Sequence, residues 1–115
     1  QFCRRGDNNL NTEKVYFCIF AHFRYLNKDL MSPGHDWAAK NTENIGEVPG
    51  LLWRRAFHIS PDRGSGIYGF DTKENMQKFL PIISNELKNY SRMFEAKLTI
   101  ETGITSPELC QDFKK

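Results

Sequence analysis

The sequence predicts an α+β domain in which strands and helices follow the order β-α-β-β-α-β. Alternating or continuous apolar residues predict strands over residues 14–24, 51–59, 66–70 and 92–102. Helical spacing of apolar residues predicts helices over 34–44 and 71–89. Turn-forming residues over 60–64 join the two middle strands as a hairpin. This order is that of the ferredoxin-like fold, with a four-stranded antiparallel sheet.

Length and composition indicate one globular domain. The chain has 115 residues, of which 39% are hydrophobic and 26% charged. We divide it into a polar N-terminal arm (1–13), the ferredoxin-like domain (14–105) and a C-terminal tail (106–115). No apolar run approaches the roughly 20 residues that a membrane span needs. The net charge of +2, with acids and bases interspersed, argues against a nucleic-acid partner.

The first strand and first helix have distinct apolar patterns. Both faces of 14–24 are apolar, so this strand is expected at the centre of the sheet. Ser32-Pro33 is a plausible N-cap and first helical residue, and Gly46 and Pro49 are stop signals. The apolar face of this helix is thin, so we expect it to border an opening rather than seal a core.

The second helix and last strand are the clearest elements. Asp71 and Glu74 fit a variant capping box. Pro81 interrupts the apolar stripe that follows, so a kink or restart is expected there, with the helix ending near Asn89. The strand over 92–102 is apolar on one side only, which suits a sheet edge.

The predicted sheet leaves one face uncovered. Both helices of this fold pack on the same side, so aromatic and aliphatic residues of the central strands would line the other. Exposed apolar sheet of this extent is unfavourable in water, and pairing two sheets across a twofold axis removes it. We therefore expect a homodimer.

Two segments resemble a known family. Residues 48–54 (VPGLLWR) and 66–70 (GIYGF) are similar to the P-G-x-L-W-[KR] and G-I-Y-x-F strands of the YdhR-like family of small monooxygenase-like proteins. With His22-Phe23 on the first strand, the resemblance covers roughly residues 14–110. It implies a dimeric α/β-barrel, related to cofactor-independent oxygenases and cyclases that act on aromatic molecules. The chain departs from the family in its N-terminal arm, its terminal cysteines, Pro81 and a glycosylation sequon.

In such a fold the pocket is expected between the sheet and the helices. A small aromatic or apolar molecule with a phenolic or enolisable group is the expected ligand. His22 is the candidate base, and Tyr68 is the candidate donor to a developing oxyanion. Four further residues are predicted to bind the substrate: Trp53, Arg55, Trp37 and Phe20. Arg55 would hold a phenolate or carboxylate, and Arg54 is the alternative for this role.

Strand alternation restricts which residues can share a pocket. Trp53 and Arg55 point to one face of their strand, and Arg54 and His58 to the other. Trp53 and His58 therefore cannot both enter one pocket without a bulge. The face of Arg54 and His58 is either a pocket wall or a solvent face, and in the second case Trp53 and Phe57 belong to the core.

Several features favour secretion over a cytoplasmic location. The sequence begins at Gln1 rather than Met, and Cys3 and Cys110 near its two ends are expected to form a disulfide. Asn89 begins an N-glycosylation sequon. Cys18, within an apolar strand, is expected to be a buried free thiol. These features support an alternative function, a secreted binding or signalling protein that uses the same cavity or its surface without turnover.

Metal and cofactor sites are not predicted. His22, His35 and His58 show no metal-ligand spacing, and the three cysteines form no C-x-x-C motif. No Gly-rich phosphate loop precedes a helix.

Overall fold

A computed structural model describes residues 15–114 and confirms the ferredoxin-like fold. The main elements are β1 (Phe17–Tyr25), α1 (Met31–Asn41), β2 (Leu51–Ser60), β3 (Arg63–Phe70), α2 (Lys73–Met93) and β4 (Ala96–Ile104). Three 3₁₀ turns, η3 (Lys28–Leu30), η4 (Ile45–Glu47) and η5 (Pro107–Leu109), complete this part of the chain. Within it, no helix is long and apolar enough to cross a membrane.

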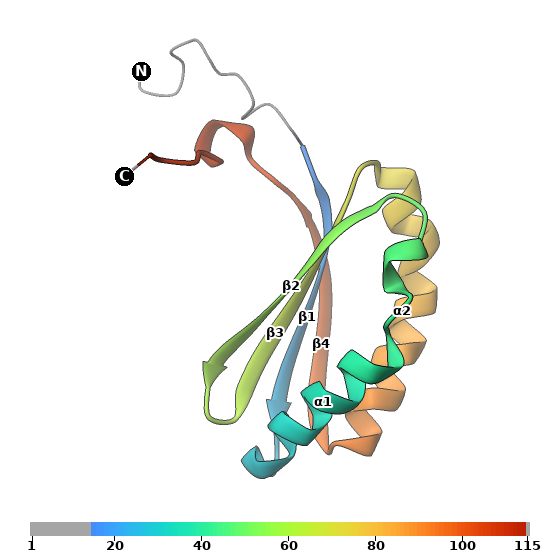
Figure 1. Ribbon diagram of the computed structural model, residues 1–115, viewed down its shortest axis with the longest axis vertical. Helices are drawn as coiled ribbons and strands as arrows, with labels where there is room; N and C mark the ends of the chain where they lie inside the picture. The colour runs from blue at the N-terminus through green and yellow to red at the C-terminus, as the bar shows by residue number, and fades with distance from the viewer. Residues whose placement is uncertain (1–14, 115) are drawn as a thin grey trace.

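The four strands form one antiparallel sheet in the order β2-β3-β1-β4. As predicted, the strand that is apolar on both faces is central and the one-sided strand β4 is an edge. Both helices lie on the same side of the sheet (Figure 1). We call that side the helix face and the other the open face.

The core lies between the helix face and α2. Ile19 and Ala21 of β1 and Phe70 of β3 are each 0% exposed. They pack against Met76, Ile83 and Leu87 of α2. Because successive strand residues point to opposite faces, this packing also determines that Phe20, His22 and Gly69 point to the open face.

Helix α2 differs from the prediction at both ends and in its middle. Its N-cap is Thr72, whose side chain accepts a hydrogen bond from the backbone N–H of Asn75 at 3.1 Å. The predicted capping box of Asp71 is therefore wrong, and the Asp71 carboxylate instead accepts from the Asn75 side chain at 2.9 Å. The helix runs unbroken through Pro81, which is exposed, so water can replace the missing backbone bond. It ends at Met93, so the last strand begins at Ala96 rather than at residue 92.

Helix α1 begins before its predicted N-cap. Met31 is its first residue, which places Pro33 in the first turn, where a missing N–H costs no intrahelical bond. Gly34 faces α2 so closely that a β-carbon there would overlap the Tyr90 hydroxyl and lie 3.3 Å from Phe94. Glycine is thus what allows the two helices to meet at this point. The helix ends at Asn41, three residues earlier than predicted.

Candidate functional site

A cavity of about 240 Å³ lies between the helix face and the two helices. Its apolar lining comes from all the main elements except β4 and includes Phe23, Ala38, Ala39, Ala56 and Leu87. Helix α1 thus forms part of the wall, as its thin apolar face indicated. Seven polar residues also belong to the lining: Tyr25, His35, Arg54, Arg55, Ser65, Tyr68 and Tyr90.

Tyr68 and Arg54 are opposite each other in the β2–β3 ladder. Tyr68 is 7% exposed, and burial raises the pKa of its hydroxyl. The Arg54 guanidinium opposes this rise in pKa, through its charge and through a hydrogen bond to the hydroxyl. Arg54 also donates to Thr42 Oγ1, just after α1, at 2.9 Å. The pair therefore presents a protonated phenol and a fixed cation at one place in the cavity wall.

His35 enters the cavity wall from α1. Burial lowers the pKa of its imidazole, the nearby His58 lowers it further, and Asp36 partly offsets both effects. The rings of His35 and His58 lie 4.8 Å apart between centroids. A lowered pKa keeps His35 neutral near pH 7, so one of its nitrogens is free to accept a proton.

Tyr25 of β1 and Tyr90 of α2 form a buried pair of hydroxyl groups in the cavity lining. Their oxygens are 2.6 Å apart. Burial raises the pKa of Tyr25, and the hydrogen bond from Tyr90 partly lowers it again. Burial also raises the pKa of Tyr90 strongly, and its contact with Tyr25 adds to the rise. Phe23, Trp37 and Phe94 surround the Tyr90 ring, with centroids 5.2, 6.2 and 5.0 Å away.

The predicted meeting of His22 with Tyr68 is wrong. His22 lies on the open face, where its Nδ1 is 2.8 Å from Ser65 Oγ and its Nε2 is 3.0 Å from Glu101 Oε2. Tyr68 faces the helices on the other side of the sheet. The cause is strand alternation, since Ala21 and Phe23 on either side of His22 face the helices.

Most of the predicted substrate-binding residues also lie outside the cavity. Phe20 stacks beside His22 on the open face, with centroids 6.3 Å apart. Trp53 lies over Gly69 there, and the guanidinium of Arg55 sits 5.2 Å from its ring centroid. Arg55 is nevertheless among the residues that line the cavity. Trp37 packs behind Tyr90 and is not in the lining. Of the predicted site residues, Tyr68 and Arg55 line the cavity, as does Arg54, the alternative arginine.

The structure settles the open question about strand β2. Arg54 reaches Tyr68 and His58 reaches α1, so their face borders the pocket, although both side chains are also exposed to solvent. Phe57 is accordingly 45% exposed on the open face rather than in the core. The sequence carried a signal for this arrangement, because Arg54 and His58 are an even number of residues apart and so lie on the same side of their strand. It carried none that singled out His35, Tyr25 or Tyr90.

The predicted covalent features remain predictions. Cys18 is 3% exposed and, as expected, a free buried thiol whose pKa is raised by burial and by Cys110. Cys110 is exposed and has no disulfide partner among the described residues, and Cys3 lies outside them. Asn89 is exposed on α2, where its side chain accepts from Arg92 at 2.6 Å.

Solved structures share this fold at low sequence identity. A dimeric ferredoxin-like protein from an uncultured marine organism is 16% identical, with 79% of this chain and 95% of that one covered and a TM-score of 0.62. The monooxygenase ActVA-Orf6 of Streptomyces coelicolor, in complex with nanaomycin D, is 17% identical, with 81% and 91% covered and a TM-score of 0.61. SnoaB, a cofactor-independent oxygenase from Streptomyces nogalater, is 9% identical, with 81% and 92% covered and a TM-score of 0.53.

At these identities the likeness shows the fold alone. No family model matches the chain, and no curated protein does.

Proposed function

We propose that the cavity binds a small aromatic molecule with an acidic or enolisable group, and that the protein is a cofactor-independent monooxygenase of the YdhR-like kind. One observation carries this proposal. A neutral imidazole, a protonated phenol and a guanidinium, from His35, Tyr68 and Arg54, line one largely apolar cavity of about 240 Å³. An apolar pocket with a few convergent polar groups is typical of small-molecule sites. The oxygenases among the structural neighbours support the same class of reaction.

Each polar group has a chemical task in this reaction. His35 takes a proton from the activated CH₂ carbon of the substrate. Tyr68 donates to the enolate oxygen that forms, and Arg54 balances its charge. The carbanion then reduces O₂ and is itself oxidised to a hydroperoxide. Loss of water leaves a carbonyl, so CH₂ and O₂ become C=O and H₂O without a further reductant.

We also propose that the protein is a homodimer joined through its open faces. Trp53 and Phe57 of β2 lie on this face, and Phe57 is 45% exposed. Covering these side chains removes apolar area from water. The neighbouring ferredoxin-like proteins are described as dimeric, which agrees with this arrangement.

The test uses dithranol, a tricyclic hydroxyanthrone with an activated CH₂ carbon. Metal-free protein in a chelating buffer is mixed with dithranol, while an oxygen electrode follows O₂ and absorbance follows the quinone product. We expect one O₂ consumed for each quinone formed, above the rate without protein. Saturable binding of dithranol without turnover would reject the oxygenase and favour the alternative, a secreted protein that binds its ligand without converting it. Absence of both binding and turnover would reject the cavity as a site for this class of molecule.

Three variants and one control assign the roles. His35→Gln should lower kcat by about 10²-fold or more, since general-base catalysis supplies an effect of that size. Arg54→Gln and Tyr68→Phe should lower kcat by up to about 10²–10³-fold each. His22→Gln changes an imidazole on the opposite face of the sheet and should leave turnover unchanged. A large effect of His22→Gln with none from His35→Gln would contradict the assignment.

A further inference from the structure

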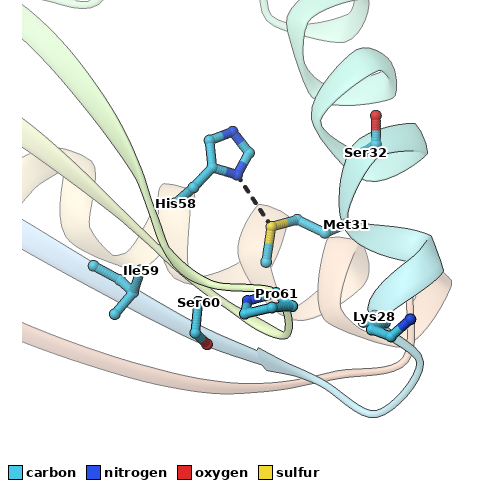
Figure 2. A pocket seen from close by; sticks show the side chains of 7 residues that line it. All are labelled: Lys28, Met31, Ser32, His58, Ile59, Ser60 and Pro61. Atoms are coloured by element: carbon cyan, nitrogen blue, oxygen red, sulfur yellow. Dashed lines mark hydrogen bonds between the residues drawn. The ribbon is translucent and has the colours of Figure 1, made fainter.

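One thioether and two imidazoles, groups that can bind soft metal ions, gather between the start of α1 and the end of β2. Met31 and His35 are four residues apart on α1, so both side chains lie on one face of the helix. His58 of β2 meets that face from the sheet, and its Nδ1 is 3.2 Å from the Met31 Sδ. Figure 2 draws this contact as a dashed line. The His58 ring also lies beside the His35 ring, with centroids 4.8 Å apart. No fold element other than these two is needed to bring the three groups together.

The spacing of the three groups suits a single shared ion. Two imidazoles that bind one ion at about 2.0 Å from each nitrogen have ring centroids roughly 5–6 Å apart. The observed 4.8 Å is slightly shorter, and a small side-chain rotation covers the difference. The space above Gly64 adjoins the same groups: a β-carbon there would lie 3.8 Å from Met31 Cε and 3.9 Å from His35 Nε2. Glycine at this position keeps a side chain out of the cluster.

We propose that Met31, His35 and His58 form a binding site for a soft monovalent metal ion of the copper(I) class. The thioether decides the metal, because thioether ligands select Cu(I), whereas protein zinc sites use thiolate, imidazole and carboxylate. Among residues 15–114, no three His, Cys, Asp or Glu side chains gather in a way that could hold a metal ion. This cluster therefore does not fit a harder divalent ion.

The surroundings of the cluster give an ion access. An open groove of about 390 Å³ reaches Met31 and His58 from the surface, bordered by Ser32, Ile59 and Pro61 among others (Figure 2). Lys28 also borders it, and its charge is partly balanced by Asp29, whose carboxylate is 3.8 Å away. Only a weak hydrogen bond between His58 and the Met31 sulfur is lost when the ion enters.

Methyl NMR tests the proposal directly. The chain has three methionines, Met31, Met76 and Met93, so ¹³C-methyl labelling gives three signals to assign. Met93 is 49% exposed and reports non-specific binding to a thioether, and Met76 is buried in the core. The 115-residue chain carries Cys3→Ser and Cys110→Ser, because thiolates would compete for soft ions. It is titrated with Cu(I) without oxygen, and separately with Ag(I).

We expect the Met31 methyl and the ring signals of His35 and His58 to shift and saturate at one equivalent, with Met93 unchanged. A Met31 signal that does not move, or one that moves only together with Met93, would overturn the proposal. Zn(II) is titrated in parallel. If Zn(II) binds the two imidazoles as tightly as Cu(I) does while Met31 stays unchanged, the thioether is not a ligand and the assignment of a soft metal is wrong.

Competition with a coloured Cu(I) chelator measures the contribution of each ligand. Met31→Leu keeps a side chain of similar volume without sulfur, and His58→Gln removes an imidazole. Each should weaken Cu(I) binding by about tenfold or more, since even indirect partners of metal ligands contribute about 10–100-fold. His22→Gln, on the opposite face, should bind like the parent. Parent-like affinity in both ligand variants would overturn the site.

This inference is independent of the oxygenase proposal, although His35 belongs to both. A bound ion would occupy the imidazole that acts as base. The binding measurements need no substrate, and the turnover assay uses a chelator. Failure of one therefore leaves the other standing.

Discussion

Tyr90→Phe tests whether the pair of hydroxyl groups in the cavity lining is sealed from water. The Tyr25 and Tyr90 oxygens are 2.6 Å apart, and the two residues are 2% and 6% exposed. Removing one hydroxyl leaves the other buried without its partner, which costs about 1–3 kcal/mol of unfolding free energy. Replacing both tyrosines removes donor and acceptor together. The double variant Tyr25→Phe/Tyr90→Phe should therefore lose less than either single variant.

Urea denaturation followed by circular dichroism measures these losses. All variants are compared at one protein concentration, because the stability of a dimer depends on concentration. With an m-value of about 2 kcal/mol/M, a loss of about 2 kcal/mol lowers the urea midpoint by roughly 1 M. Tyr16→Phe, beside Trp53 on the far side of the sheet, serves as the control. The reasoning is refuted if the double variant loses the sum of the two single losses, since each hydroxyl would then act alone or bind water from the cavity.

Two further predictions concern pH and assembly. Tyrosines ionise near pH 10 in the unfolded chain, below the raised pKa values of Tyr25 and Tyr90 in the folded protein. The stability that this difference supplies is complete below about pH 10 and declines above it. The urea midpoint should therefore fall as the pH is raised above about 10, and fall less in the double Phe variant. An equal fall in both proteins would contradict this cause. Phe57→Glu, on the open face, should convert the dimer to monomer in analytical ultracentrifugation, whereas Ile82→Glu, at a 58% exposed position on α2, should not. The opposite result would place the dimer contact on the helices.

The fold could be predicted because its signals are local and repeat along the chain. Apolar residues on both faces of 17–25 mark a central strand, and the stripe of Met76, Ile83 and Leu87 marks a helix packed on it. The errors fall where neighbouring residues offer similar local energies. Thr72 and Asp71 are both good N-caps, and the hydrogen bond to Asn75 uses Thr72. Pro81 does not break α2, because packing of the stripe on both sides outweighs one lost backbone bond.

The site was predicted less well, because strand alternation is a property of the sequence but the choice of face is not. Period-two alternation separates Arg54 from Trp53 wherever the strand lies. Which of the two meets the helices depends on where α1 and α2 pack and on what covers the other face of the sheet. Residue type alone favours Trp53 in the core and Arg54 in water. In the folded protein Trp53 is half-buried and Arg54 exposed, as residue type suggests, but Arg54 lies beside Tyr68 at the cavity, and Trp53 lies on the open face against Gly69. Tertiary packing thus made the site from His35, Arg54 and Tyr68 and left His22 on the other side of the sheet.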